Sequence, residues 1–354
     1  MEKSVAGMDK KKRIQNLVKW VLVLGLLAFA FIKKKEFMLE ALAEVAESPK
    51  PVIFVCFALA NLYFIAEGTV ISRMTHTGEN TLTIPQGIAC TYMCAFYRLA
   101  TFGSGNGIAQ VYYYSTKGID VSRATGMSIV QYTFQKITIG IVGVASFVVL
   151  IIIGDRQVLE YTGYMIAGVI VISLICLALF LITVSKTISN IVMGIAYKLV
   201  KKGSKLYARL ADAQHAIDNL QDQGRIVWHN KKVFLQVIAL DVLKLACWYM
   251  IPGVYFYQDF KENLFMCLAI MAVVNMLGCV MLAPSGMGTL ELMFAIFFGA
   301  IIPDDHSIAA ALVVYRFFTW IVPFLFGLFP ALLLNKKDKQ ESPIPDRIDE
   351  SHQL

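Results

Sequence analysis

Charged residues are scarce in this sequence of 354 amino acids, and their scarcity excludes most soluble proteins. Only 16% of the residues are Asp, Glu, Lys or Arg, whereas 57% are hydrophobic, and the mean hydropathy is +0.63. A soluble globular domain of this length could not stay in water with such a composition. We therefore exclude a soluble enzyme and a nucleic-acid-binding domain, and the sequence predicts no nucleic acid among the partners.

The sequence also lacks the motifs with which soluble enzymes bind nucleotides, attack esters or hold metals. It contains no P-loop, GxSxG, CxxC or HxxxH pattern. Its seven cysteines all fall in apolar segments, which is typical of small buried side chains. Cys90 and Cys94 share a helix face, but no His or carboxylate beside them completes a metal set. The sequence predicts no metal and no cofactor.

The alternation of apolar and polar residues that marks a transmembrane barrel is absent as well. The sequence instead has apolar runs between short polar loops, and many of them approach the roughly 20 residues of helix that cross a bilayer about 30 Å thick. Because backbone groups in hydrocarbon must satisfy their own hydrogen bonds, the sequence predicts an all-α, polytopic helical membrane protein. The nine apolar segments are 17–32, 51–71, 84–102, 125–153, 163–184, 233–257, 264–282, a short piece after Leu282–Gly288, and 308–334.

The net charge of +7 is concentrated beside these segments. Basic residues cluster in residues 1–16, in the polar segment 185–232 and in the tail, 335–354. The positive-inside rule places all three in the cytoplasm, with the membrane domain at 17–334, and the polar tail is predicted to be disordered. Termini on the same side require an even number of crossings. We therefore expect about eight transmembrane helices and one or two re-entrant segments, with 84–102 as the first candidate.

Within the polar segment 185–232, apolar residues at heptad-like spacing predict an amphipathic helix. They are Leu206, Leu210, Ala213, Ile217 and Leu220. Such a helix can pack on the body of the protein, lie on lipid head groups or bind a partner. Packing on the body is the simplest of these interpretations.

Two glycine-rich breaks interrupt apolar segments, and each follows a Leu-Ala pair. The first contains Gly103, Gly105 and Gly107, and the second contains Pro284, Gly286 and Gly288. Such breaks in corresponding positions of two halves indicate an internal repeat with a transporter site at its interface. Close packing of helices through small residues explains each break equally well. Both interpretations stay open.

Charged side chains inside the apolar segments are few, and each costs about 2.5 to 3.5 kcal/mol to insert into the membrane. They are Glu67, Arg98, Lys136, Asp241, Lys244, Glu291 and Arg316. Asp241 and Lys244, three residues apart, are predicted to neutralise each other on one helix. Glu291 and Arg316 lack a charge on their own helix face, so we expect them to pair across helices. With Arg98 they either line a polar path for a lipid head group or form a purely structural ion pair.

The candidate substrate path joins these charges to the two breaks. Its members are Arg98, Gly103, Gly105, Gly107, Gln110, Pro284, Gly286, Gly288, Glu291 and Arg316. The glycines would let the backbone approach a ligand closely, and Arg98 would attract a phosphate. The three tyrosines at 112–114, which follow the first break, are expected to be interfacial aromatics.

Three stretches of the sequence carry a resemblance to a known family. They are ATFGSGNGIAQVYYYSTKGI (Ala100–Ile119), LAPSGMGTLE (Leu282–Glu291) and VVYRFFTWIVPFLFG (Val313–Gly327). Over nearly the whole chain, the pattern resembles the lysylphosphatidylglycerol synthase transmembrane family, the flippase-like membrane domain of the bacterial multiple peptide resistance factor and its stand-alone relatives. The first motif departs from the family pattern at Ala100, Thr101 and Asn106 and lacks its second Pro. The second motif also lacks one Pro.

The resemblance implies translocation of a phospholipid or a lipid-linked head group, for example aminoacylated phosphatidylglycerol, between the leaflets of the bacterial cytoplasmic membrane. This activity would contribute to envelope charge and to resistance against cationic peptides. Full-length relatives add a transferase domain, which we expect to be missing here because the chain stops at Leu354 after a short tail. The expected partners are membrane phospholipid, a separate transferase or other lipid-modifying enzyme, and a second copy of the chain in a homo-oligomer. Two alternatives stay open: a subunit of phosphatidylglycerol lysyltransferase, and a small-solute secondary transporter.

Overall fold

A computed structural model of the protein describes residues 43, 46–77, 80–101, 103, 105–153, 160, 162–200, 204–256, 264–280, 288–302 and 304–341. These residues form helices and no strand, which confirms the predicted all-α class. The predicted N-terminal segment 1–16 and the predicted first span, 17–32, lie outside the described residues. Of the predicted tail, residues 335–341 are described, and they continue the last helix.

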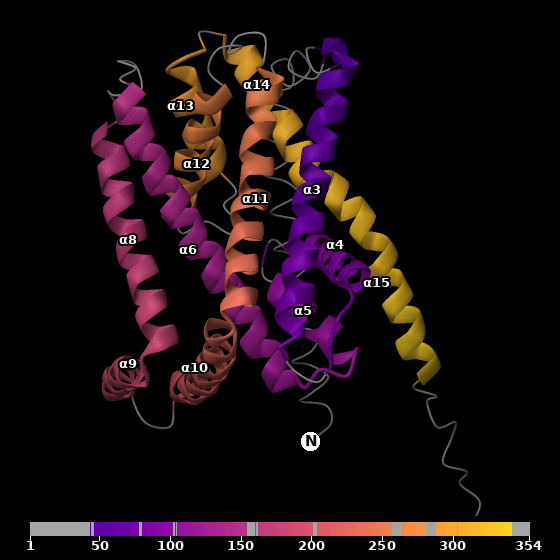
Figure 1. Ribbon diagram of the computed structural model, residues 1–354, viewed down its shortest axis with the longest axis vertical. Helices are drawn as coiled ribbons and strands as arrows, with labels where there is room; N and C mark the ends of the chain where they lie inside the picture. Colours follow the sequence, from indigo (N-terminus) through magenta and orange to yellow (C-terminus); the bar gives the residue numbers. More distant parts are fainter. Residues whose placement is uncertain are drawn as a thin grey trace, which may run out of the picture.

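Five helical stretches in the described part of the chain are long and apolar enough to cross a membrane. They are α3 (Lys50–Thr75), α6 (Val121–Ile153), α8 (Thr162–Val184), α11 (Lys231–Tyr255), and the continuous run of α14 (Asp305–Arg316), the π-helical segment η2 (Phe317–Ile321) and α15 (Val322–Glu341). Figure 1 shows them running roughly along the long axis, with α3, α8 and the α14–α15 run directed downward and α6 and α11 directed upward. The polytopic architecture is therefore as predicted.

Four shorter helices form two hairpins at the glycine-rich breaks. The first hairpin consists of α4 (Ile84–Ala100) and α5 (Asn106–Ser115), and the second of α12 (Leu264–Val280) and α13 (Thr289–Gly299). With 17 residues each, α4 and α12 are about 26 Å long, shorter than a hydrocarbon core of about 30 Å. The α4–α5 hairpin lies in the lower half of the molecule and the α12–α13 hairpin in the upper half (Figure 1).

The two hairpins occupy equivalent places in two similar series of helices. In the first series, α3 leads down to the α4–α5 hairpin, and α6 then runs upward; in the second, α11 leads up to the α12–α13 hairpin, and the α14–α15 run returns downward (Figure 1). This is the order expected of an inverted-topology repeat, in which broken helices meet from opposite sides. The predicted re-entrant segment at 84–102 corresponds to the first hairpin.

About eight spans were expected for the whole chain, and the described residues account for only part of that number. The described residues hold five helices of spanning length, and 17–32 lies outside them. The segment 264–282 was expected to be a span of its own, whereas its helix is one arm of a hairpin. Apolar composition alone does not distinguish a spanning helix from a shorter one that is buried by its neighbours. The buried helix α12 has this property, since most of its residues are buried in the largest apolar core.

Helix α4 is held between α3 and α15 by close contacts at glycines. A Cβ atom added at Gly87 would collide with the backbone carbonyl oxygen of Gly68 in α3, and one added at Gly327 would collide with that of Tyr92 in α4. Small residues of this kind let helix backbones approach each other inside a membrane. They fix the depth and tilt of α4, and hence the position of the first break.

Helices α9 (Lys186–Leu199) and α10 (Lys205–His229) run across the lower end of the molecule rather than along it (Figure 1). The Ser185 and Ser204 side chains cap them by accepting hydrogen bonds from the amides of Ile188 and Tyr207. The predicted amphipathic helix is thus confirmed as α10. It packs on α6 and α8, with Leu220 in a buried cluster, so packing on the body of the protein was the correct interpretation.

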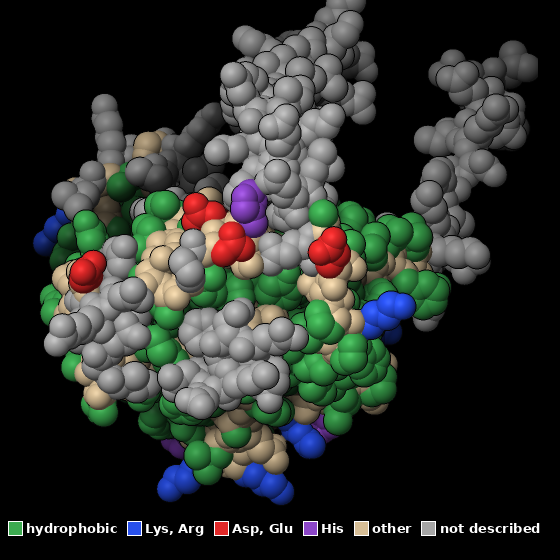
Figure 2. All heavy atoms as spheres, turned by 90° about the horizontal axis from the view of Figure 1, so that it is seen from above, with side chains coloured by type: hydrophobic (Ala, Val, Ile, Leu, Met, Phe, Trp, Pro, Cys, Tyr) green, Lys and Arg blue, Asp and Glu red, His purple; other side chains and the backbone are tan. Residues whose placement is uncertain are grey.

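The surface has an apolar circumference and two differently charged ends. Large hydrophobic side chains are exposed along the long helices, for example Ile141 at 63% and Leu174 at 61%. Seen from above, green side chains line the rim and acidic ones lie on the facing end (Figure 2). Exposed acidic residues near this upper end are Glu47, Glu160, Asp304 and Asp305, and exposed basic residues at the lower end are Lys186, Lys198, Arg225, Lys231 and Lys232.

Candidate functional site

Three charged side chains meet between α3 and α11. Lys244 Nζ lies 2.6 Å from Asp241 Oδ1 and forms a second ion pair with Glu67 Oε2. The side chains of Lys244 and Asp241 are 0% and 1% exposed, so the charges could not remain ionised there without each other. The predicted pairing of Asp241 with Lys244 is confirmed. The participation of Glu67 was not predicted, because α3 and α11 are far apart in sequence.

A chain of hydrogen bonds leads from this charged cluster to the first hairpin. Gln131 in α6 donates to Glu67 Oε1 at 2.6 Å. Gln110 in α5 donates through Nε2 to Gln131 Oε1 at 2.6 Å and to the Tyr114 hydroxyl at 2.9 Å. The links are side-chain amides, a carboxylate and a phenol hydroxyl, and Glu67, Gln110, Gln131 and Tyr114 are all buried. Four helices, α11, α3, α6 and α5, are therefore joined by one polar network.

A polar cavity of about 80 Å³ lies beside this network, large enough for several water molecules. It is bounded by α3, α4, α5 and α6. Its lining residues are Tyr63, Phe64, Glu67, Ile71, Thr91, Cys94, Ala95, Arg98, Asn106, Gln110, Gln131 and Gln135. Two residues of the predicted path, Arg98 and Gln110, thus face the same cavity, together with Glu67. The cavity begins at the first break, since Asn106 is the first residue of α5.

Arg98 lies in the last turn of α4 and reaches the π-helical segment η2. Its guanidinium donates to the carbonyl oxygen of Thr319 at 3.3 Å, and its Cζ lies 5.7 Å from the centre of the Trp320 ring. Within the described part of the chain, Arg98 forms no ion pair with a carboxylate. Single π-helical turns are frequent at functional sites. Here the turn places a carbonyl and an aromatic face beside a cavity-lining arginine.

Glu291 and Arg316 form the predicted pair across helices. Arg316 Nε donates to Glu291 Oε1 at 2.7 Å, and its NH2 group lies 2.6 Å from the same oxygen. Glu291 Oε2 also accepts from the backbone amide of Gly288 at 2.7 Å and so caps α13 at the second break. The Arg316 Cζ lies 4.5 Å from the Trp320 ring centre. Because Arg98 and Arg316 both lie near this ring, residues adjoining the two breaks converge on Trp320.

The glycines of the breaks have different structural roles. Gly103 and Gly288 have φ angles of 95° and 83°, a conformation that side chains other than glycine rarely adopt. Gly105 precedes α5, and its amide donates to the Thr101 hydroxyl at 2.6 Å. A Cβ added at Gly107 would meet nothing within 4 Å. The remaining predicted members, Pro284 and Gly286, lie outside the described residues.

Two of the three tyrosines expected at the membrane interface are instead buried. Tyr113 and Tyr114 are 4% and 0% exposed, and Tyr114 receives the hydrogen bond from Gln110. The interfacial prediction was wrong for them because α5 is a buried arm of the hairpin rather than the end of a span. No signal in the local sequence distinguishes these two environments, since both favour aromatic residues with a polar tip.

The site at the first break combines an arginine, Arg98, and a carboxylate, Glu67, in one cavity. Such an arrangement can hold an anionic group at Arg98 and a cationic group near Glu67, with amides between them as neutral hydrogen-bonding partners. Among the described residues, no group of three or more His, Cys, Asp and Glu side chains could hold a metal ion. The side chains that line the cavity can bind a polar or charged group.

A comparison with known protein families identifies the family of this chain. No curated protein matches this chain, but a family model, described as the lysylphosphatidylglycerol synthase TM region, matches residues 16–327. The matched range includes both hairpins, the charged cluster and the pair of Glu291 with Arg316. Together with the five helices of spanning length, the match identifies a multi-pass membrane protein. The chain belongs to the lysylphosphatidylglycerol synthase TM region family, as its motifs indicated.

Proposed function

We propose that this protein moves a phospholipid between the two leaflets of the membrane and that the polar cavity at the first break carries the head group. The observation that supports this proposal most strongly is that Arg98, Glu67 and Gln110 face one cavity between broken helices. Non-helical backbone is tolerated at membrane depth where it is buried in protein or lines a wet cavity. A head group could pass through such a path while the acyl chains stay in lipid.

The arrangement of charges favours a lipid whose head group carries both signs. Arg98 has no carboxylate partner among the described residues and is suited to a phosphate. Glu67 is shared with Lys244 and Gln131, and the cluster of two carboxylates and one ammonium has a formal charge of −1. A cationic group is attracted to that end of the cavity. Aminoacylated phosphatidylglycerol, which has a phosphate and free amines, fits both ends.

The biological consequence of this proposal concerns the charge of the cell envelope. A lipid with a cationic head group, moved to the outer leaflet, makes the negative surface potential smaller and weakens the attraction of polybasic peptides. A separately encoded transferase would supply that lipid, and this partnership is part of the proposal. Uptake of a water-soluble solute by liposomes that contain the purified protein would instead favour a secondary transporter.

A leaflet-resolved assay tests the proposal. The purified protein is placed in liposomes with head-group-labelled phosphatidylglycerol or its lysyl ester, and a membrane-impermeant quencher reports how much label reaches the outer leaflet. We expect Arg98→Gln to slow transfer about tenfold or more, because a hydrogen bond to a charged group contributes about 1.5–3 kcal/mol. Gly105→Leu should do the same, because its Cβ would lie 2.6 Å from the Thr101 hydroxyl.

The matched control is Lys198→Ala, which removes an exposed charge from α9, outside the cavity. It should transfer lipid at the rate of the parent protein. Unfolding midpoints in detergent show whether each variant is folded. If Arg98→Gln and Gly105→Leu are both folded and transfer lipid at the parental rate, the cavity at the first break is not the path.

A further inference from the structure

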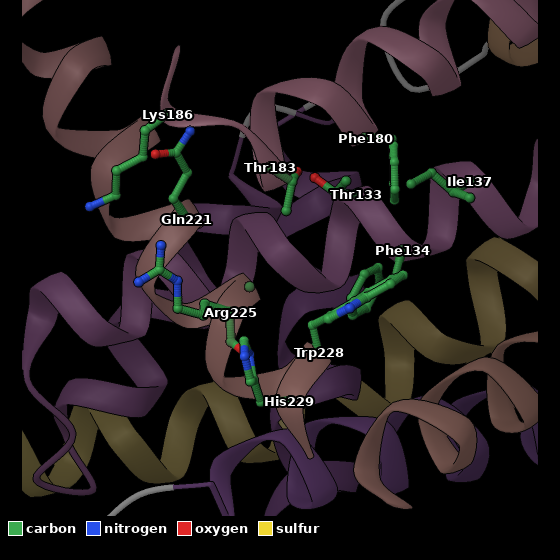
Figure 3. Close-up of a pocket in the computed structure, with 11 residues that line it drawn as sticks. Thr133, Phe134, Ile137, Phe180, Thr183, Lys186, Gln221, Arg225, Trp228 and His229 are labelled. Atoms are coloured by element: carbon green, nitrogen blue, oxygen red, sulfur yellow. The ribbon is translucent and has the colours of Figure 1, made fainter. Parts of the chain in front are cut away.

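A second cavity, of about 110 Å³, lies outside the polar network, where α10 packs across the lower ends of α6 and α8. Figure 3 shows its lining side chains. They are Thr133, Phe134 and Ile137 from α6, Phe180 and Thr183 from α8, Lys186 from the start of α9, and Gln221, Gly224, Arg225, Trp228 and His229 from α10. None of these residues lines the cavity at the first break. The two cavities are therefore separate sites.

The lining divides into a basic part and an apolar part. Lys186, Arg225 and His229 lie along one side of the close-up, and Phe180 and Ile137 lie on the other (Figure 3). Phe180 and Ile137 are also one helical turn farther from the lower end than Thr183 and Thr133, given the directions of α8 and α6. The basic part thus lies at the level of α9 and α10, and the apolar part faces the middle of the bundle. An amphiphile with an anionic head matches this order.

Two polar atoms in this cavity have no partner in the part of the chain that the structure describes. The Thr133 hydroxyl and the Gln221 carbonyl oxygen are both buried and unpaired. The orientation of the Gln221 amide is fixed, since its nitrogen donates to the carbonyl oxygen of Ile182 at 2.6 Å and to the Ser189 hydroxyl at 3.0 Å. Its free oxygen therefore needs a donor. Buried polar atoms without a partner are unfavourable, and a ligand with hydroxyl and carbonyl groups would satisfy both.

We propose that this cavity binds a phospholipid with an anionic head group that carries hydroxyls, of the phosphatidylglycerol type, as a resident lipid of the α9–α10 end. The phosphate lies between Lys186 and Arg225, a head-group hydroxyl donates to Gln221, and Thr133 donates to an ester carbonyl. One acyl chain runs along Phe180 and Ile137. This site does not depend on lipid translocation, because it shares no residue with the proposed path.

The acidic residue nearest to this basic group does not prevent phosphate binding. Asp222 lies 3.9 Å from Lys186 Nζ, but the two side chains are 64% and 60% exposed. An ion pair between side chains so exposed is weak, and a phosphate that contacts both Lys186 and Arg225 can compete with it. A lipid in this cavity would contact α6, α8 and α10 together, and we expect it to stabilise their packing.

Lipid titration of the purified full chain tests this proposal. Native mass spectrometry measures retained lipid, and the unfolding midpoint measures stabilisation, with phosphatidylglycerol compared against phosphatidylcholine of the same acyl chains. We expect the parent protein to retain phosphatidylglycerol and to be stabilised by it. The double variant Lys186→Ala with Arg225→Ala should bind it at least tenfold more weakly. Both side chains are exposed, so the variant should fold, and Lys198→Ala is the matched control.

Thr133→Val gives a second, independent test. Because the Thr133 hydroxyl has no protein partner, its replacement by a methyl group of similar shape should raise the unfolding midpoint in the absence of lipid. The same variant should bind phosphatidylglycerol several-fold more weakly. If Thr133 served packing alone, Thr133→Val would raise the unfolding midpoint without changing the affinity for phosphatidylglycerol.

Three results would overturn the proposal. The first is equal retention of phosphatidylcholine and phosphatidylglycerol by the parent protein, and the second is parental affinity in the double variant. The third is full stabilisation by inorganic phosphate alone, which would identify a site for the free anion. Each of these experiments measures lipid binding rather than lipid transfer. If Arg98→Gln loses transfer but still binds phosphatidylglycerol in the α9–α10 cavity, the result bears only on the path at the first break.

Discussion

At the scale of single residues, the three charges buried between α3 and α11 neutralise one another. Lys244 contacts both Asp241 and Glu67, and Glu67 also accepts a hydrogen bond from Gln131. In a medium of low dielectric constant, such a network is stable only if its members remain together. Removing one charge should therefore be far more harmful than removing all of them.

This argument gives a prediction for the cluster of Glu67, Asp241 and Lys244. Lys244→Met leaves two carboxylates buried together without a cation, and it should lower the free energy of unfolding by about 3–5 kcal/mol. The triple variant Lys244→Met with Glu67→Gln and Asp241→Asn keeps the shapes and removes every charge, so it should recover most of the stability. Thermal unfolding in detergent measures both. A single variant as stable as the parent would mean that the carboxylates are protonated or solvated.

The pair of Glu291 and Arg316 allows a sharper distinction between structure and function. Its side chains are 35% and 18% exposed, so breaking it should cost about 1–2 kcal/mol, between the values for exposed and for buried pairs. We expect Glu291→Gln and Arg316→Met each to be destabilised by that amount, and Glu291→Leu with Arg316→Met to regain part of it.

Lipid transfer by the double variant then decides the role of this pair. A stable double variant that still moves lipid would show that the pair is purely structural, whereas a stable and inactive one would support a role in the path. If each single variant matches the parent in stability and transfer, the ion pair contributes nothing measurable.

The sequence predicted two of these pairings for different reasons. Asp241 and Lys244 are three residues apart on one helix, so their contact follows from helix geometry. Glu291 and Arg316 were paired by elimination, because a buried charge needs a partner. Glu67 and Trp320 could not be placed in this way. Their contacts depend on how α3 meets α11 and on how the π-helical turn directs residue 320, and both are set by tertiary packing.

At the scale of helices, the first break is positioned by the contacts of α4 on both of its sides. Gly87 lies against Gly68 of α3, and Gly327 of α15 lies against Tyr92. Gly68, Gly87 and Gly327 thus serve close packing of helices, the role that the sequence left open for the glycines of the breaks. The two purposes are connected, because close packing of α4 holds Arg98 beside the cavity.

We predict that Gly87→Ala lowers the free energy of unfolding by about 1–3 kcal/mol, the usual result of overpacking, because its Cβ would collide with a backbone carbonyl. The matched control is Gly194→Ala in α9, where an added Cβ meets nothing within 4 Å. The control should be neutral or slightly more stable, since Ala favours helix over Gly. Equal unfolding midpoints for the two variants would contradict the close approach of α3 and α4.

The sequence predicted a helix correctly as a span only where an apolar run was also long enough to cross the membrane. The five long helices follow directly from apolar runs of sufficient length. Helices α12 and α13 are equally apolar but shorter, and their fold into a hairpin depends on the second break and on their neighbours. The burial of Tyr113 and Tyr114 has the same origin. An apolar run specifies that a segment avoids water, but not whether lipid or protein surrounds it.

At the scale of the whole molecule, the two hairpins lie in opposite halves, and the two ends differ in their exposed charges. The α4–α5 hairpin lies in the half that carries α9 and α10, and the α12–α13 hairpin lies in the other half (Figure 1). At the first end, exposed basic residues outnumber the exposed Asp120, Asp218 and Asp222, whereas exposed acidic residues predominate at the second end. The positive-inside rule counts Lys and Arg near the helix ends, and we therefore predict that the end with α9 and α10 faces the cytoplasm.

The orientation can be tested at two exposed positions that α8 separates, Glu160 before it and Lys198 in α9. After the seven native cysteines are replaced by alanine, Glu160→Cys and Lys198→Cys are treated separately with a membrane-impermeant thiol reagent in intact cells. We expect Glu160→Cys to be labelled directly and Lys198→Cys only after permeabilisation, because α8 has the length and hydropathy of a span. The reversed pattern would invert the molecule, and it would place the proposed phosphatidylglycerol site in the outer leaflet. Direct labelling of both positions would show that α8 does not cross the membrane. The α4–α5 and α12–α13 hairpins would then not enter the membrane from opposite sides. The interpretation as an inverted-topology repeat would be wrong in that case.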